Sequence, residues 1–348
     1  MFRVRAIQVD HGDSLLVSYG SQERPFHLLI DGGPSGSLTT LLDVLRRARV
    51  DGRLRLEALI VTHYDLDHIQ GIIELLTEIP SWLEIRDVWF NGHHHLAPED
   101  TLGPGEGDTL SKLIRNKHLP WNVEFRRSEG DVDGGPVEQS VKGFTLDGDL
   151  WVNILSPDAQ GLQALAQKWP KADLPPDDSS STPSDLLGRG DEWPPRAFSR
   201  TRVGHFHSDT SVPNRSSIAL LLTYGKKRAL LAADAFSDVV KAGLALHLRA
   251  GEAIDLLKVS HHGSKGNTDR QLLDVLGCNR FLISTSGSRH KHPDHDLIER
   301  LVADYNDPEI IFNYGVGWPA NWHDIPISWP SFRATYPEPS NPFVDVLL

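Results

Sequence analysis

The sequence around residue 65 reads Thr62-His63-Tyr64-Asp65-Leu66-Asp67-His68. The residues before it, 58–61, are apolar and partly β-branched, as in a buried strand, and residues 69–77 have the spacing of a helix. Two histidines and two aspartates therefore lie at a strand-to-helix turn, where their side chains can face one cavity. Burying imidazoles and carboxylates at this density costs free energy unless they have partners, and a divalent cation can be that partner. The alternative is a solvated polar loop.

Other acidic and histidine residues follow short apolar runs in the same way. Asp31, Asp234 and the pair His261-His262 each end such a run, and helical patterns lie between the runs. This alternation is typical of an α/β protein. The predicted strands are residues 2–9, 14–19, 26–30, 58–62, 85–91, 123–125, 217–223, 228–233, 256–260 and 280–285, with a hairpin arm over 145–155 and helices at 38–48, 69–77, 236–250, 268–276 and 294–303.

Composition narrows the kind of metal site and the class of partner. The chain has 17 histidines but a single cysteine, Cys278, which excludes a Cys-based zinc cluster and a disulfide framework. The formal net charge is −12, so the protein does not coat nucleic acid through bulk positive charge. An enzyme that meets phosphates at bound cations remains compatible with this charge.

Residues 63–68, followed by Gly71, resemble the metal motif of the metallo-β-lactamase fold hydrolases. The usual form of that motif is His-x-His-x-Asp-His, and Asp65 stands where the second histidine would be. This variant resembles the one in the soluble domain of the ComEC-type DNA-uptake proteins and their free-standing relatives. Further stretches resemble the same subgroup in the same order, namely residues 12–17, 28–33, 214–221, 230–235, 256–264 and 292–293.

The resemblance implies an α/β fold, specifically a metallo-β-lactamase-like αββα sandwich with two mixed sheets. We expect one domain over residues 1–348. Residues 170–213 are rich in Pro, Asp and Ser with little periodicity, and they predict a surface loop or lid inserted into that domain.

The resemblance also implies a set of metal ligands. His63 and Asp65 would face a first metal, Asp67 and His68 a second, and Asp234 would bridge the two. Asp31 would orient the ligand loop by hydrogen bonds from outside the ligand set; the alternative is an ordinary turn aspartate. His292 matches the position of the family's last ligand.

The roles of His261 and His262 stay open. Neighbouring residues of a strand point in opposite directions, so at most one is a primary ligand unless the chain bends at Gly263. We favour His262 as ligand or proton donor, with His261 as the alternative, and Lys265 is a third candidate proton donor. The family's middle histidine has no clear counterpart, and its candidates are His93, His94, His95, His205 and His207. For His290 and His295 we expect solvated surface positions.

Asp65 bears on the identity of the metal. A carboxylate in place of an imidazole hardens the first site, which favours Mn²⁺ or Mg²⁺ relative to Zn²⁺. The expected cofactor is therefore one or two divalent ions, Zn²⁺ or Mn²⁺.

The leading functional hypothesis is a phosphodiesterase or nuclease that uses a metal-bound hydroxide, with Asp67, His261, His262 and Lys265 as catalytic candidates. A small-molecule hydrolase acting on a lactone, thioester, lactam or cyclic nucleotide is the second, and a degenerate non-catalytic scaffold the third. A basic groove of Arg196, Arg200, Arg202 and Arg215 would favour nucleic acid as substrate. Trp193, Trp318, Trp322 and Trp329 either line a closed pocket or belong to the core.

The N-terminal residues alternate like a strand and lack the apolar segment of a signal peptide. The apolar runs are strand-sized, too short to span a membrane. We therefore expect a cytoplasmic protein with no membrane partner, a nucleic acid or other phosphodiester as substrate, and no protein partner that the sequence identifies.

Overall fold

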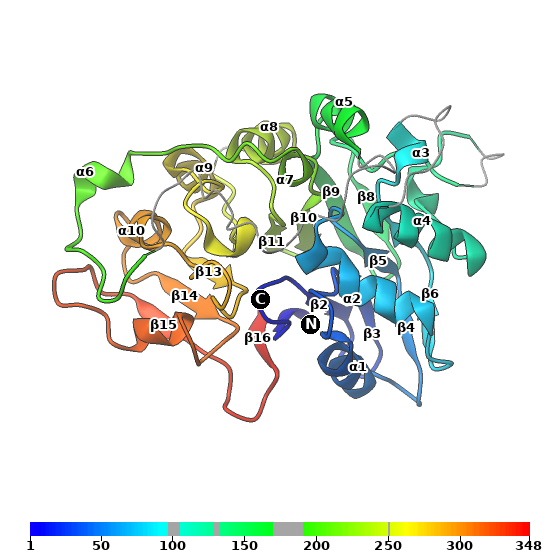
Figure 1. Cartoon of the computed structure of the whole chain (residues 1–348), viewed down its shortest axis with the longest axis horizontal. Helices are drawn as coiled ribbons and strands as arrows, with labels where there is room; N and C mark the ends of the chain where they lie inside the picture. Colours follow the sequence, from blue (N-terminus) through cyan, green and yellow to red (C-terminus); the bar gives the residue numbers. More distant parts are fainter. Residues whose placement is uncertain (97–104, 129–132, 170–190, 250) are drawn as a thin grey trace.

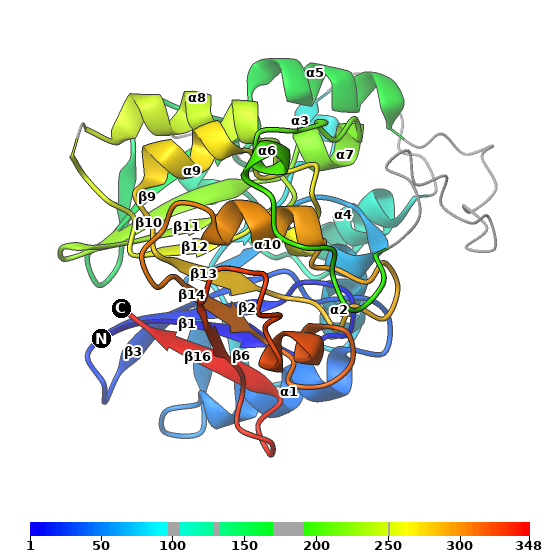
Figure 2. The same ribbon diagram turned by 90° about the vertical axis from the view of Figure 1, so that its left-hand side faces the viewer.

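The computed structural model describes residues 1–96, 105–128, 133–169, 191–249 and 251–348. Two large sheets face each other, and helices cover the outer face of each sheet (Figures 1 and 2). The predicted α/β sandwich with two mixed sheets is therefore confirmed. No helix in the described part of the chain is both long and apolar enough to cross a membrane.

The first sheet has the strand order β16-β1-β2-β3-β5-β7. Its first half is antiparallel, and β3, β5 and β7 are parallel neighbours. The N- and C-terminal strands pair with each other, which brings the two chain ends close together (Figure 1). The strands are β1 (Phe2–Ile7), β2 (Leu15–Gly20), β3 (Pro25–Ile30), β5 (Ala58–Ile60), β7 (Val88–Trp89) and β16 (Phe343–Leu347).

The second sheet has the strand order β15-β14-β13-β12-β11-β10-β9-β8. Its antiparallel part contains the predicted hairpins, and its parallel part runs from β11 to β15. The strands are β8 (Phe144–Leu146), β9 (Leu150–Ser156), β10 (Ala219–Tyr224), β11 (Lys227–Leu231), β12 (Leu256–Lys258), β13 (Arg280–Ile283), β14 (Glu309–Phe312) and β15 (Arg333–Thr335).

Three apolar clusters hold these layers together. One lies between the two sheets, where Val17, Leu28 and Leu220 are among the buried side chains. Another packs α1 (Leu38–Arg47), α2 (Leu66–Thr77) and α4 (Glu106–Asn116) on the first sheet. The third packs helices on the second sheet, namely α8 (Ser237–His247), α9 (Arg270–Leu276) and α10 (His295–Val302).

Smaller elements complete the described structure. A short parallel pair, β4 (Leu54–Leu56) and β6 (Leu83–Ile85), forms a separate small sheet next to β3. Residues Val123–Phe125 form a 3₁₀ turn, so the strand predicted there is wrong. The remaining segments are α3 (His93–Leu96), α5 (Ala159–Lys168), α6 (Arg200–Val203), α7 (Val212–Arg215) and the 3₁₀ turns His261–Gly263 and Pro319–His323.

The parallel strands determine where the polar loops gather. Strands β3 and β5 are parallel neighbours, and so are β11, β12 and β13. The carboxyl ends of parallel neighbours lie at one edge of a sheet, so the loops after these strands meet there. Gly71 in α2 contacts the first of these loops closely, since a Cβ atom at Gly71 would lie 2.0 Å from the backbone oxygen of Gly32. Helix α2 is thereby held against the loop that follows β3.

The Pro-rich insertion is only partly described. Residues 170–190 lie outside the described residues. Residues 191–209, here called the strap, run along α10 and are bound to it by the ion pairs of Arg196 with Asp296 and of Arg202 with Glu299, of which the second is the more buried. This part of the insertion is a packed segment of the surface.

The tryptophan cluster near the strap belongs mainly to the core. Trp322 and Trp329 are buried, and Trp193 packs against the same cluster. His295 lies among these rings, only 4% exposed, with Trp318 stacked on it. The surface position expected for His295 is therefore wrong, because α10 turns this residue toward the tryptophans. His290, by contrast, is exposed as expected.

Candidate metal centre

The carboxylate of Asp234 is the centre of the polar cluster. Asp234 follows β11 and is buried, and its Oδ2 atom faces the Nε2 atoms of four histidines from two loops. The distances from Oδ2 to these Nε2 atoms are 3.4 Å for His68, 3.6 Å for His261, 3.9 Å for His262 and 4.0 Å for His63. Several electron-pair donors therefore converge on one shared carboxylate.

Two further carboxylates flank Asp234, both from the loop that follows β5. Asp65 Oδ2 lies 3.5 Å from His63 Nε2. Asp67 Oδ2 lies 3.1 Å from His262 Nε2 and 3.9 Å from His68 Nε2. Residues 63–68 thus deliver all four predicted ligand side chains to one place, because the chain turns from β5 into α2 within this loop.

His261 and His262 both face the cluster, which strand geometry allowed only if the chain bends at Gly263. Residues His261–Gly263 form a 3₁₀ turn after β12, and His261 and His262 have φ angles of 50° and 54°. Gly263 also has a positive φ, 94°, so the chain bends at Gly263 and at the two residues before it, and the usual alternation of a strand is lost. Both imidazoles can therefore reach Asp234.

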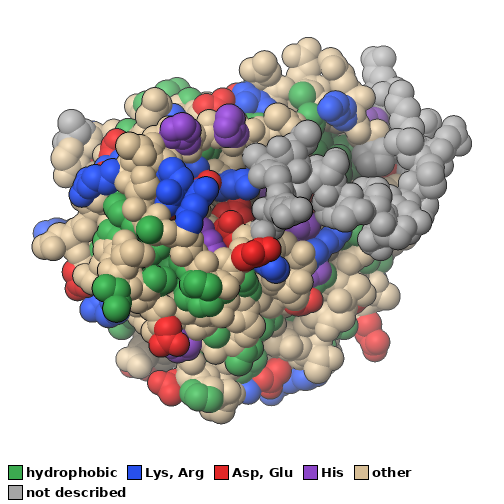
Figure 3. Space-filling view, turned by 60° about the vertical axis from the view of Figure 1, so that its left-hand side comes forward, with side chains coloured by type: hydrophobic (Ala, Val, Ile, Leu, Met, Phe, Trp, Pro, Cys, Tyr) green, Lys and Arg blue, Asp and Glu red, His purple; other side chains and the backbone are tan. Residues whose placement is uncertain are grey.

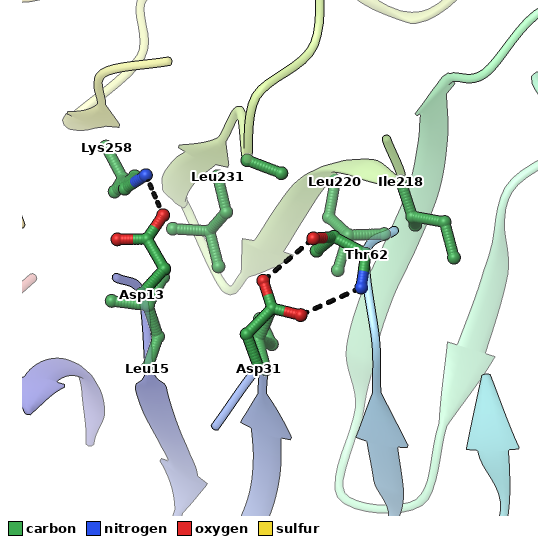
Figure 4. A pocket seen from close by; sticks show the side chains of 10 residues that line it. Asp13, Leu15, Asp31, Thr62, Ile218, Leu220, Leu231 and Lys258 are labelled. Carbon is green, nitrogen blue, oxygen red and sulfur yellow. Dashed lines mark hydrogen bonds and ion pairs between the residues drawn. The ribbon is translucent and has the colours of Figure 1, made fainter. Parts of the chain in front are cut away.

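Hydrogen-bonding groups on the Nδ1 side of the rings orient His63 and His68. His68 Nδ1 lies 2.8 Å from Asp31 Oδ2, and Asp31 also accepts hydrogen bonds from the backbone N–H and the hydroxyl of Thr62 (Figure 4). His63 Nδ1 lies 3.1 Å from the hydroxyl of Ser217. Asp31 thus has the orienting contacts that the resemblance implies, which fix the ring nitrogens that face Asp234.

Asp13 and Lys258 form a buried ion pair beside the cluster that the sequence did not single out. Their side chains are 3% and 0% exposed, and Figure 4 shows them meeting at the side of a small cavity between the sheets. Asp13 Oδ1 lies 3.5 Å from His262 Nδ1. One atom from each of Asp13, His68, Asp234 and His262 lies within 4.8 Å of the others. Residues 12–17, which contain Asp13, resemble the family, but that resemblance assigns Asp13 no role in the site.

Charge is distributed unevenly over this cluster. Burial alone would lower the pKa values of His261 and His262, but nearby carboxylates raise them to about 9 and about 10. Burial would raise the pKa values of Asp67 and Asp234, yet the surrounding imidazoles hold both well below the usual range. The carboxylates therefore favour the protonated forms of His261 and His262, and a divalent ion would compete with those protons.

The residues fit a divalent metal. The Nε2 atoms of His63, His68 and His262 and the Oδ1 atom of Asp234 are buried and have no hydrogen-bond partner among the described residues. Buried polar atoms normally have partners, so these atoms call for a ligand. Donors bound to one tetrahedral ion at roughly 2.0–2.1 Å lie about 3.3 Å apart. The separations of 3.1–4.0 Å between the paired imidazoles and carboxylates are close to that value.

The other predicted site residues lie at the edge of the cluster. His292 contacts Asp294 at 3.5 Å, and its ring centre is 5.9 Å from that of His261. No ion pair of His292 with Asp67 or Asp234 occurs among the described residues, so its role as a ligand stays a prediction. The backbone N–H of Lys265 donates to Asp294.

The candidates for the middle histidine lie elsewhere. His93, His94 and His95 pack against Trp169 and Trp121. His205 and His207 are exposed on the strap. Among the described residues, none of these five pairs with Asp65, Asp67 or Asp234. His261, by contrast, does pair with Asp234.

Comparison with known proteins gives a family match for part of the chain. Residues 23–145, about a third of the sequence, match the family model of the Metallo-beta-lactamase superfamily. This segment contains Asp31 and the whole ligand loop at 62–68. No curated protein matches the chain.

The matches to solved structures have low sequence identity. A mutant of CmlA beta-hydroxylase is 12% identical with a TM-score of 0.42, and the match covers 99% of this chain but only 54% of that one. YhfI from Bacillus subtilis, a metallo-beta-lactamase fold protein, is 14% identical with a TM-score of 0.40 over 99% of both chains. The short form of human tRNase Z is 12% identical with a TM-score of 0.39, covering 82% of this chain and 92% of that one. These likenesses do not determine the substrate of this chain.

Proposed function

We propose that the protein is a metal-dependent hydrolase of the metallo-β-lactamase fold and that its substrate is a phosphodiester. The observation that carries the proposal is the position of Asp234, whose Oδ2 lies within 4.0 Å of four imidazole Nε2 atoms. Three of those Nε2 atoms are buried without a hydrogen-bond partner among the described residues. A shared carboxylate between two sets of donors suits a pair of divalent ions.

The donors divide into two sets around Asp234. Asp67, His68 and His262 are mutually close and would hold one ion. His63 and Asp65, 3.5 Å apart, would contribute to the other. Bound ions of this kind supply Lewis-acid activation and neutralise the charge that develops on a phosphate during displacement.

The chain's own residues prepare the site for that chemistry. Asp31 and Ser217 fix the ring orientations of His68 and His63. The leaving oxygen needs a proton, for which His261 and Lys265 are the candidates, because His262 is buried and would hold one ion together with Asp67 and His68. The three site carboxylates, Asp65, Asp67 and Asp234, favour a harder ion, and we expect Mn²⁺ to support activity at least as well as Zn²⁺.

One observation favours a compact substrate over a long polyanion. Each arginine of the groove considered above contacts a carboxylate: Arg196 with Asp296, Arg200 with Asp304, Arg202 with Glu299, and Arg215 with Asp158 and Asp238. On the face shown in Figure 3, the blue Lys and Arg side chains lie beside red carboxylates. A small-molecule hydrolase is therefore the second candidate function.

The test is cleavage by the purified full-length chain with Mn²⁺ or Zn²⁺. The substrates are bis(p-nitrophenyl) phosphate, a cyclic nucleotide, and single- and double-stranded DNA. The proposal expects phosphodiester cleavage that is lost in the Asp67→Ala/His68→Ala variant and kept in a control with the same residue types away from the cluster, Asp43→Ala/His118→Ala, where Asp43 is half-buried and His118 exposed. Cleavage that persists unchanged in the Asp67→Ala/His68→Ala variant would contradict it.

A parallel set of substrates separates the second candidate. Hydrolysis of a lactone, thioester or lactam, without cleavage of any phosphodiester, would favour a small-molecule hydrolase. Failure of the wild-type chain to bind either ion after reconstitution, measured by elemental analysis, would favour a non-catalytic scaffold.

A further inference from the structure

The strap ends at Asp209, whose side chain enters the metal cluster from the insertion. The strap is fixed along α10 by ion pairs, and its end is tied down by the backbone N–H of Asp209, which donates to the oxygen of Gly266. The side chain of Asp209 is 15% exposed. A segment that otherwise belongs to the protein surface therefore places one carboxylate beside His261.

Asp209 is the centre of a hydrogen-bond network behind His261. Its Oδ2 accepts from the side-chain amides of Asn214 at 2.7 Å and Asn267 at 3.0 Å, and lies 3.4 Å from His261 Nδ1. Because the NH₂ group of Asn267 points to Asp209, its oxygen faces His261 Nδ1 at 3.0 Å. Asp209 thus acts on the imidazole both directly and through Asn267.

This network leaves the other ring nitrogen of His261 directed at the cluster. His261 Nε2 lies 3.6 Å from Asp234 Oδ2. Within 4.0 Å it has no ion pair with Asp67 among the described residues, whereas His262 does at 3.1 Å. His261 thus approaches the shared carboxylate without an ion pair to Asp67. The set formed by His63 and Asp65 has one imidazole, whereas the set formed by Asp67, His68 and His262 has two.

We infer that Asp209 is a positioning residue that holds His261 as the second imidazole donor of the first metal site, together with His63, Asp65 and Asp234. The inference rests on the proposed function, since it assumes that the cluster binds two ions. With His261 in this role, the two halves of the site have the same set of donors: two imidazoles, one carboxylate of their own and the shared Asp234. It also leaves Lys265 as the candidate proton donor.

The strap provides a matched control for this inference. Asp191, at its other end, lies 3.5 Å from His295 Nδ1, close to the 3.4 Å between Asp209 and His261 Nδ1. His295 is among tryptophans and away from Asp234. The substitutions Asp191→Asn and Asp209→Asn therefore remove the same charge from the same kind of pair, and only the second pair reaches the metal cluster.

The experiment is a titration of the chelator-treated full-length chain with Zn²⁺, and separately with Mn²⁺, against a chromophoric competitor. Removing a carboxylate that orients a ligating histidine typically weakens metal affinity 10–100-fold. We expect Asp209→Asn to weaken one of two bound equivalents by about that factor, and Asp191→Asn to leave both unchanged. In a His261→Ala background, Asp209→Asn should cause no further loss, because its effect passes through His261.

Two results would overturn the inference while the proposed function stands. One is an Asp209→Asn chain that binds both ions like the wild type. The other is a loss of metal affinity on adding Asp209→Asn to His261→Ala that is as large as the loss in the wild-type background. That result would show that Asp209 acts only on the general structure. A wild-type chain that binds neither ion would remove the proposed function together with this inference.

Discussion

The Nδ1 atom of His68 lies 2.8 Å from the Oδ2 atom of Asp31 in the interior of the protein. With a cation bound, this contact would hold the ring proton on Nδ1 and leave the lone pair of Nε2, 3.4 Å from Asp234 Oδ2, to ligate the cation. Asp31 has a φ of 57°, a left-handed conformation that aspartate and asparagine tolerate better than most residues. The turn after β3 therefore positions the ligand loop through a single carboxylate.

Replacing Asp31 by Asn should weaken metal binding without altering the backbone. The amide retains the shape but loses the charge that orients His68, so we expect affinity for Zn²⁺ or Mn²⁺ to fall about 10–100-fold. Isothermal titration calorimetry measures this directly. The control is Asp51→Asn, since Asp51 has a φ of 52° and is exposed. Equal affinities for Asp31→Asn and the control would contradict the orienting role.

Gly71→Ala tests the close contact between α2 and the loop after β3. Alanine would ordinarily favour a helix by about 1 kcal/mol. Here its Cβ would lie 2.0 Å from the backbone oxygen of Gly32, and relieving that overlap requires one of the two backbone segments to move. We expect the free energy of unfolding to fall by about 1–3 kcal/mol in urea titrations. Gly204→Ala is the control, because no atom lies within 4 Å of a Cβ placed there, and it should change little. A stabilised Gly71→Ala protein would show that the contact relaxes.

Local patterns in the sequence were sufficient to predict much of the fold. The apolar runs after residues 2, 26, 228 and 256 form β1, β3, β11 and β12, with bounds shifted by a few residues. Strand β16 was missed because its stability comes from pairing with β1, and nothing local marks the C-terminal residues as partners of the N-terminal ones. The predicted strand at 123–125 was wrong because three apolar and charged residues do not distinguish a strand from a single turn.

The site was predictable where its ligands are consecutive. Residues 63–68 and Asp234 converge in the structure as the resemblance implies. Asp13, Lys258 and Asp209 were not predicted because each is an ordinary polar residue whose partner is distant in the chain; Asp13 and Lys258 are 245 positions apart. The joint approach of His261 and His262 depends on two left-handed φ angles, which are uncommon for residues other than glycine and which the strand pattern does not indicate.

Replacing only one member of the buried ion pair between Lys258 and Asp13 should lower the free energy of unfolding. The ammonium of Lys258 offsets the burial of Asp13 and holds the pKa of that carboxyl well below its usual value. Lys258→Met would leave Asp13 charged and without that cation, and we expect a loss of about 3–5 kcal/mol in unfolding free energy. Urea titration in the presence of a chelator separates this effect from metal binding.

The double variant Lys258→Met/Asp13→Asn serves as the comparison. Removing both charges avoids an isolated buried ion, so it should be more stable than Lys258→Met alone. If the double variant is no more stable than Lys258→Met, the loss comes from packing and the ion pair contributes little.

His27 predicts a specific acid sensitivity away from the metal cluster. It lies in β3, 2% exposed, with its Nδ1 atom 2.9 Å from the hydroxyl of Ser18. Burial, together with the positive charges of Arg3 and Arg5, lowers the pKa of His27 to about 4. The unfolded chain binds a proton near pH 6.5, whereas the folded protein does so only near pH 4. The contribution of uncharged His27 to the free energy of unfolding is therefore fully present above about pH 6.5 and is lost as the pH falls to about 4. The loss is at most about 1.4 kcal/mol per pH unit.

His27→Asn isolates this contribution. Asparagine can keep the hydrogen bond to Ser18 and does not titrate, so unfolding free energies between pH 7 and pH 4 should fall less steeply than in the wild type. His118→Asn is the control, because His118 is exposed and should leave the slope unchanged. The site carboxylates titrate in all three proteins, so their effect cancels in the comparison. Parallel curves for His27→Asn and the wild type would mean that His27 takes up its proton in the folded state as readily as in the unfolded chain.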